Sequence, residues 1–127
     1  MIRVAIAVIQ KDGKFLIARR KKRGPFQGMW EFPGGRVEEG ETPEECICRE
    51  AAEELGIDIS VEGLICSNTH SYPHETVELM AYRASLLSGE MNTREYDEIT
   101  WASPHELPRH AFPVANAPLI EKLLQQC

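Results

Sequence analysis

The segment GGRVEEGETPEECICREAAEELGI, residues 34–57, decides the fold of this chain because it combines strong helix signals with an unusual concentration of charge. Residues 38–54 carry eight carboxylates against one basic residue, Arg49. Like charges three or four residues apart on a helix repel each other by roughly 0.2 to 0.5 kcal/mol per pair. A folded protein that keeps such a cluster needs something that compensates the repulsion.

Both ends of the helix can be recognised in this segment. Thr42 is a good N-cap, Pro43 suits the first turn, and Glu45 stands where the second half of a capping box belongs. Gly56 supplies the residue type that most often ends a helix. The sequence therefore predicts a helix between Thr42 and Gly56.

A helical wheel with 100° per residue divides this helix into two sides. The apolar side is predicted to contain Ile47, Cys48, Ala51, Ala52 and Leu55. The polar side is predicted to contain Cys46, Arg49, Glu50, Glu53 and Glu54. Arg49 can neutralise one carboxylate, and the remaining ones suit a hard divalent cation, Mg²⁺ or Mn²⁺ before zinc. A solvated acidic helix without a metal is the alternative.

The order of residue types in this segment resembles the Nudix box of the Nudix hydrolases. Seven positions carry that resemblance: Gly35, Glu41, Arg49, Glu50, Glu53, Glu54 and Gly56. Ala51 departs from it, because the pattern usually has a bulkier aliphatic residue there. The resemblance implies an enzyme that hydrolyses a nucleoside diphosphate linked to another moiety, with Mg²⁺ or Mn²⁺ as cofactor.

The resemblance also implies roles for individual residues. The metal ligands would be Glu50, Glu53 and Glu54, with the backbone of Gly34 and Gly35 helping through carbonyl groups. Arg49 would orient a neighbouring glutamate, and Glu41 would hold the loop. A metal held in this way neutralises phosphate oxygens and activates the attacking water.

Three further segments resemble the MutT-type branch: IARRKKRGPFQGMWEFPGG at 17–35, REYDEITW at 94–101 and FPVANAPLIEKL at 112–123. This resemblance implies hydrolysis of a nucleoside triphosphate to the monophosphate and pyrophosphate, with 8-oxo-dGTP as the leading substrate. The alternatives are CTP or 5-methyl-dCTP, a nucleotide sugar, and a nucleotide-binding module without turnover. In SYPHE, residues 71–75, a histidine and a glutamate stand where such enzymes place a basic residue, which weakens the 8-oxo-guanine assignment.

The resemblance to the MutT-type branch also implies a role for Arg20, which would contact a phosphate group or another part of the nucleotide. Its planar guanidinium group carries several N–H donors and suits such a contact. Glu95 is expected to act as a general base or added metal ligand from a loop, with Asp97 and Glu98 as rivals. Asn116 is expected to read a purine edge, because an amide both donates and accepts. The same residue also stands where an N-cap belongs.

Aromatic residues are the candidates for stacking on the base. Phe32, Tyr82 and Phe112 could line a base pocket, although two of the three are expected to belong to the core. Trp30 and Trp101 are expected to be packing residues. His70 and His74 straddle a proline, which makes a helical metal pair improbable.

The rest of the chain predicts an α+β fold, an α/β/α sandwich in which helices pack on a mixed sheet. Residues 3–9 and 14–18 read as a hairpin, since Asp-Gly separates them. Residues 64–72, 76–87 and 98–101 read as strands. Ser103 is expected to begin a short helix, and a last helix is expected to end near residue 124.

Composition limits the function classes. The 127 residues fit one domain, 1–127, and the net charge of −6 argues against binding a nucleic-acid polymer or an anionic membrane. The N-terminal apolar run is too short to span a bilayer, so a cytoplasmic location is expected. Four scattered cysteines suggest no disulfide framework. The expected partner is a small nucleotide, and the expected state is a monomer or weak dimer.

Overall fold

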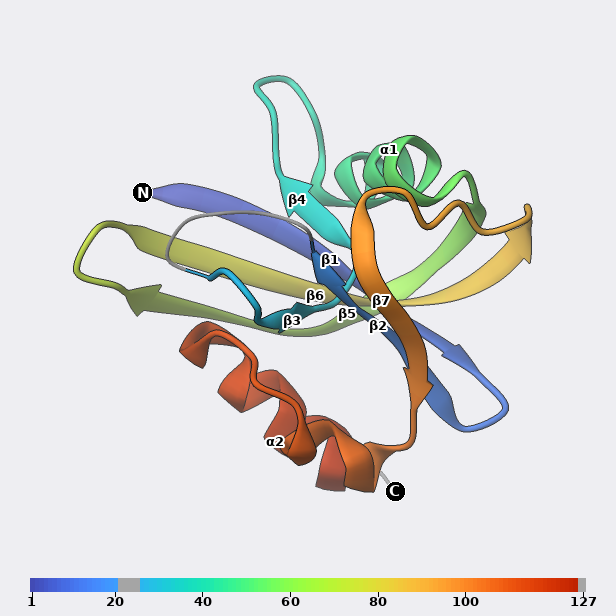
Figure 1. The fold of residues 1–127 in the computed structure, drawn as a ribbon. Coiled ribbons are helices and arrows are strands. Elements are labelled where there is room, and N and C mark those ends of the chain that lie inside the picture. Colours follow the sequence, from blue (N-terminus) through green and yellow to red (C-terminus); the bar gives the residue numbers. More distant parts are fainter. Residues whose placement is uncertain (21–25, 126–127) are drawn as a thin grey trace.

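The structure is a computed structural model that describes residues 1–20 and 26–125. Of Arg20 it describes the backbone and not the side chain. Within these residues seven strands form a mixed sheet of order β3-β2-β1-β6-β5, in which β4 pairs with β1 and β7 with β2 (Figure 1). The strands are β1 Ile2–Lys11, β2 Lys14–Arg20, β3 Trp30–Glu31, β4 Gly34–Arg36, β5 Asp58–Ser71, β6 Thr76–Ser88 and β7 Tyr96–Ala102.

Helices cover the two faces of the sheet. They are α1 Pro43–Leu55, the 3-10 turns η1 Pro104–Arg109 and η2 Val114–Asn116, and α2 Ala117–Gln125. Figure 1 shows α1 on one side of the strands and α2 on the other. The predicted α+β sandwich is confirmed. No helix within residues 1–20 and 26–125 is both long and apolar enough to span a membrane.

The predicted hairpin exists only at its turn. Asp12 and Gly13 have positive φ angles of 52° and 75°, and β1 pairs with β2 at Gln10 and Lys11 alone. The rest of β1 pairs in parallel with β6 and antiparallel with β4, whereas β2 pairs with β7. The reason is burial on both faces, because residues 5–9 are all buried and such a strand needs neighbours along both edges.

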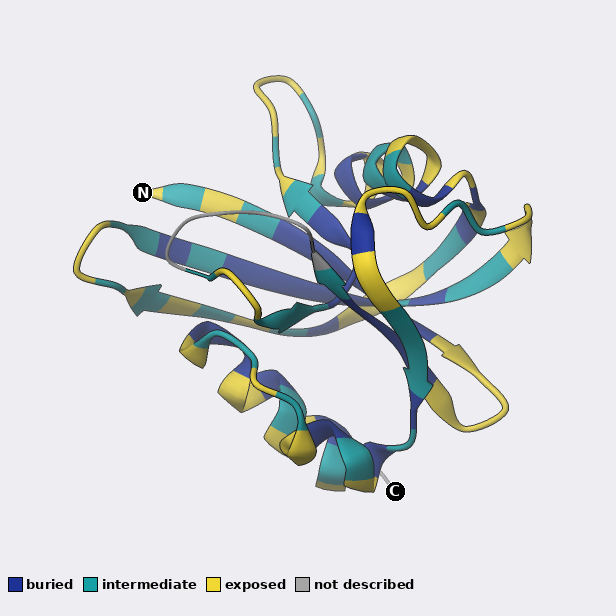
Figure 2. Ribbon diagram, in the orientation of Figure 1, coloured by how far each residue is buried: buried dark blue, intermediate teal, exposed yellow. Residues whose placement is uncertain are grey.

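Alternate residues of β1 face two separate cores, as the period of a strand requires. Ala5, Ala7 and Ile9 pack in the core under α1, and Ile6 and Val8 pack in the core under α2. Figure 2 shows this buried sheet between helices whose outer faces are exposed. The strand β1 therefore joins both halves of the molecule.

The ends of α1 agree with the prediction. Thr42 Oγ1 accepts a 3.1 Å hydrogen bond from the Glu45 amide, and Glu45 Oε1 accepts one of 2.9 Å from the Thr42 amide. Gly56 ends the helix in the left-handed region, at a φ of 69°. A second capping box forms at Ser103, where the Ser103 amide donates to Glu106 Oε1 at 2.8 Å. The segment that follows it is a 3-10 helix.

The predicted sides of α1 need a correction. The buried residues are Cys46, Ile47, Ala51 and Leu55, whereas Cys48 and Ala52 are exposed. The contact with β4 causes this rotation, because Cys46 Sγ donates to the carbonyls of Gly35 and Arg36 at 3.5 and 3.4 Å. Since Cys46, Glu50 and Glu54 are spaced by four residues, the same rotation brings both glutamates toward β4.

Candidate active site

Arg49 is the centre of a charged cluster on α1. Its Nε and Nη2 donate to Oε2 and Oε1 of Glu41 at 2.6 and 3.0 Å. This bidentate pair connects the helix to the loop before it. Its Nη1 donates to Glu50 Oε1 at 3.0 Å and to Glu53 Oε2 at 3.3 Å. One cation thus offsets the repulsion among carboxylates that the sequence concentrates on this helix.

Glu41 is the carboxylate that this cluster holds most firmly. The hydrogen bonds from Arg49, together with one from the Glu38 amide at 3.0 Å, lower the pKa of Glu41 to about 2. The same contact raises the pKa of Arg49. Both side chains therefore stay charged at neutral pH, and the loop stays attached to the helix.

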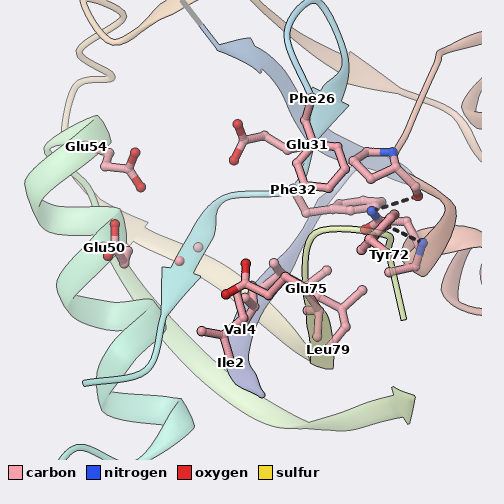
Figure 3. A pocket seen from close by; sticks show the side chains of 17 residues that line it. Ile2, Val4, Phe26, Glu31, Phe32, Glu50, Glu54, Tyr72, Glu75 and Leu79 are labelled. Carbon is pink, nitrogen blue, oxygen red and sulfur yellow. Dashed lines mark hydrogen bonds between the residues drawn. The ribbon is translucent and has the colours of Figure 1, made fainter. Parts of the chain in front are cut away.

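A cavity of about 430 Å³ opens beside this cluster (Figure 3). At one end Glu50 and Glu54 project into it from α1, and Figure 3 shows Glu31 and Glu75 between that end and the aromatic rings. The floor is apolar and consists of β1 and β6 side chains: Ile2, Val4, Ile6, Val77 and Leu79. The cavity has an acidic end and an apolar, aromatic end.

Side chains from three separate segments build the aromatic end. Tyr72 Oη accepts a 2.8 Å hydrogen bond from the Ala115 amide, which ties the β5–β6 turn to η2. Asn116 is 8% exposed, lines the cavity, and donates from Nδ2 to the Pro113 carbonyl at 3.1 Å. Phe26 meets Tyr72 with ring centroids 5.0 Å apart. The polar edge of Asn116 is thus held among aromatic and apolar groups.

The structure gathers several of the residues that the sequence singled out. The cavity lining includes Phe32, Gly34, Gly35, Glu50, Glu54 and Asn116. Phe32 is buried and stacks on Phe112 at 5.3 Å, so this ring belongs to both the core and the lining. The side chain of Arg20 lies outside the described residues.

Other candidates lie elsewhere. Tyr82 was one of three aromatic residues considered for the base pocket, two of which were expected in the core. It packs in the core under α1, because it pairs with Ala7 on β1 and shares that face of the sheet. Glu53 borders the site, where Arg49 binds it and its side chain is 61% exposed.

Glu95 stands in the loop before β7, and this loop is attached to the end of α1. The Asn92 amide donates to the Leu55 carbonyl at 2.8 Å, which satisfies one of the free carbonyls at the helix terminus. Glu95 and Asp97 are exposed, and Glu98 pairs with Arg19 at 3.7 Å. The loop that carries Glu95 is therefore positioned by the helix that carries the other carboxylates.

The donor set at the acidic end fits a hard divalent cation, since it consists of carboxylate oxygens. Gly35 leaves room for one of these carboxylates, because a Cβ at this position would lie 2.6 Å from Glu50 Oε1. Among the described residues no three potential ligands are already grouped closely enough to hold a metal, and Arg49 binds Glu50 and Glu53 instead.

A family model described as the NUDIX domain matches residues 4–122 of the chain. The chain belongs to the Nudix family. Among its relatives, a protein named CTP pyrophosphohydrolase from Escherichia coli is 33% identical over 98% of this chain and 92% of its own length. One named 8-oxo-dGTP diphosphatase from Haemophilus influenzae is 35% identical over 99% of this chain and 93% of its own length.

Solved structures agree with the sequence relatives. The solution structure of the Escherichia coli ORF135 protein matches with a TM-score of 0.86 and 32% identity, covering 98% of this chain and 89% of that one. A MutT Nudix hydrolase from Burkholderia pseudomallei matches with a TM-score of 0.83 and 31% identity, covering 95% and 96%. The resemblance to MutT-type Nudix hydrolases is confirmed. The chain is a hydrolase of a family that acts on pyrophosphate bonds of nucleotides with divalent cations.

Four polar or aromatic residues of the cavity were not assigned to the Nudix site from the sequence: Phe26, Glu31, Tyr72 and Glu75. Phe26 and Glu31 belong to residues 17–35, which resemble the MutT-type branch but in which no role was predicted for these two residues. Tyr72 and Glu75 flank the turn between two predicted strands, where Pro73 marks a change of direction. That turn was the available signal, since loops at strand ends often carry functional residues.

Proposed function

We propose that this Nudix hydrolase converts nucleoside triphosphates to the monophosphate and pyrophosphate with Mg²⁺, which Mn²⁺ can replace, and that 8-oxo-dGTP is its leading substrate. One observation carries the proposal: a single cavity has Glu50 and Glu54 at one end and Asn116 among aromatic side chains at the other (Figure 3). A nucleotide also has one charged end and one flat, aromatic end, namely its anionic phosphates and its base.

At the acidic end Glu50, Glu53 and Glu54 would hold the cation, which neutralises phosphate oxygens and lowers the pKa of an attacking water. Arg49 orients Glu50 and Glu53 through its Nη1. Glu95 is the candidate for a general base or an added ligand. Its loop is attached to the end of α1, which suits a group that completes the site when substrate is bound.

At the other end Asn116 is proposed to read the base. One amide hydrogen is used by the Pro113 carbonyl, and the group as a whole offers a second hydrogen and a carbonyl oxygen. A purine edge that mixes donors and acceptors matches such a group. Phe32 and Tyr72, which line the cavity, supply the apolar surface for the ring.

A pyrimidine triphosphate is the second candidate. The relative named CTP pyrophosphohydrolase covers 98% of this chain at 33% identity, so a cytosine substrate has support of the same order as 8-oxo-guanine. In addition, Glu75 lines the cavity in the turn where enzymes of the MutT-type branch are expected to have a basic residue. This difference weakens the assignment of 8-oxo-dGTP relative to the pyrimidine.

The test is a set of nucleotides with the same phosphate chain: 8-oxo-dGTP, dGTP, CTP, dCTP and 5-methyl-dCTP, each with Mg²⁺. Separation of the products by chromatography shows whether the monophosphate and pyrophosphate appear together, and kcat/KM ranks the bases. We expect 8-oxo-dGTP to rank first. A higher rank for CTP or 5-methyl-dCTP would move the assignment to the second candidate. Tight binding without any product would indicate a binding module.

A further inference from the structure

Glu75 has a fixed position in the turn between β5 and β6. The Tyr72 amide donates to the Glu75 carbonyl at 2.7 Å, and the Glu75 amide donates to the Tyr72 carbonyl at 3.2 Å. These two backbone hydrogen bonds hold the turn, and Figure 3 shows the carboxylate of Glu75 pointing into the cavity. Because the backbone of the turn is held in this way, the Glu75 carboxylate is available to a ligand without a rearrangement of the turn.

Neighbouring contacts locate Glu75 between the two ends of the cavity. On one side its carboxylate lies 3.8 Å from Arg36, the residue after Gly35, where Glu50 approaches the backbone. On the other side Tyr72, its partner in the turn, binds the Ala115 amide next to Asn116. Glu75 thus stands between the acidic end and the base-reading end.

The order of groups in a nucleotide then fixes what Glu75 faces. The sugar separates the phosphates from the base, so it lies at the level of Glu75 when the phosphates meet Glu50 and Glu54. This placement of the sugar rests on the proposed function, which sets the orientation of the nucleotide in the cavity. Sugar hydroxyls are hydrogen-bond donors, whereas an ionised carboxylate only accepts.

We infer that Glu75 is a specificity-determining residue that accepts a hydrogen bond from a sugar hydroxyl of the bound nucleotide. The alternative is a surface ion pair with Arg36, whose side chain is 65% exposed, and such pairs contribute little. The two roles differ in one measurable respect. A hydroxyl contact makes the effect of Glu75 depend on the sugar, whereas an ion pair with Arg36 affects every nucleotide equally.

The experiment compares sugars with the base held constant. The probes are GTP, dGTP and ddGTP, and CTP, dCTP and ddCTP, with kcat/KM measured for wild type and Glu75→Ala. Dissociation constants of GMP, dGMP and ddGMP, and of the cytidine set, give a readout that needs no turnover. We expect wild type to prefer a hydroxyl-bearing form over the dideoxy form by about tenfold, as a hydrogen bond to a charged group allows. In Glu75→Ala the ratio should fall to about one.

Glu78→Ala is the matched control. Glu78 lies three residues further along the same hairpin and binds Arg3 at 3.0 Å instead of lining the cavity, so its removal should leave the sugar ratio unchanged. Equal ratios in wild type and Glu75→Ala, or no preference in wild type, would overturn the inference. Lack of turnover by wild type on every triphosphate would count against the proposed function instead, and the monophosphate constants would still decide the role of Glu75.

Discussion

Arg49 Nε donates a 2.6 Å hydrogen bond to Glu41 Oε2, so the middle of α1 is attached to the loop that precedes it. The guanidinium group that makes this contact also binds Glu50 and Glu53. Glu41 therefore determines how much of the Arg49 guanidinium remains available to the carboxylates that are proposed to bind the cation.

Replacement of Glu41 by glutamine should weaken the response to Mg²⁺. A glutamine cannot accept two hydrogen bonds from Arg49 with both terminal atoms, so one of the donors that Glu41 now holds would be released. The guanidinium group could then bind Glu50 and Glu53 more strongly and compete with the cation. We expect the Mg²⁺ concentration for half-maximal activity to rise about tenfold, as is usual when a supporting partner of a metal ligand is lost. Glu39→Gln, an exposed change in the same loop, should have no effect.

Acid should destabilise wild type more than Glu41→Gln. The pKa of Glu41 is lowered from 4.5 to about 2 in the folded state. A lowered pKa contributes stability above the unfolded value, and this contribution is lost as the pH falls from about 4.5 through 2. Thermal unfolding followed across that window should show a steeper fall for wild type. Because the lowered pKa of Glu106 acts in both proteins, the difference between them isolates Glu41. Parallel curves would contradict the assignment.

Glu53→Gln should strongly reduce turnover and leave the fold intact. Its side chain is 61% exposed, so we expect the free energy of unfolding to change by less than about 0.5 kcal/mol. If Glu53 binds the cation, kcat should fall roughly 100- to 1000-fold, in the range seen when a group that stabilises transition-state charge is removed. Glu44→Gln, exposed on the same helix, is the control. Wild-type rates for Glu53→Gln would refute the metal role.

Two adjacent glycines should respond differently to alanine. At Gly34 the φ angle is 153° and the added Cβ would lie 2.2 Å from the Ala5 carbonyl oxygen, so Gly34→Ala should fail to fold. At Gly35 the three atoms nearest to the added Cβ all belong to the side-chain carboxylate of Glu50, which can shift more easily than backbone. Gly35→Ala should therefore fold, with a small change in melting temperature, and lose affinity for Mg²⁺ in calorimetry with nucleotide present. Unchanged affinity would show that Glu50 tolerates displacement.

Asn116→Ala should change the order of preferred bases. Loss of a polar group that reads the base typically changes discrimination by about tenfold or more. Asn68→Ala is a stringent control, because Asn68 Nδ2 donates to the Ala115 carbonyl at 3.1 Å beside the same turn but does not line the cavity. If both variants rank 8-oxo-dGTP, dGTP and CTP as wild type does, Asn116 has only a structural role.

The sequence predicted what depends on local interactions. The ends of α1 could be predicted because Thr42, Glu45 and Gly56 act within one helical turn of the positions that they terminate. The Asp12-Gly13 turn was predicted for the same reason. The neighbours of β1 could not be predicted, since its pairing with β6 joins residues more than seventy positions apart, such as Ile2 and Val77.

The position of Tyr82 could not be predicted for the same reason. Alternation in residues 76–87 predicts two faces of a strand, but only the pairing with β1 decides which face lies under α1. The rotation of α1 toward β4 depends likewise on Cys46 finding the carbonyls of Gly35 and Arg36. The cavity residues Tyr72 and Glu75 come from a turn whose position depends on the rest of the fold.

The two ends of the cavity come from different stretches of chain. The acidic end is encoded almost entirely by residues 34–54, whereas the other end is assembled from Phe26, Phe32 and the turns near residues 72–75 and 113–116. Mutations in these turns can accumulate without passing through forms that have lost the acidic helix. The base preference of the cavity can therefore change while its acidic end stays the same.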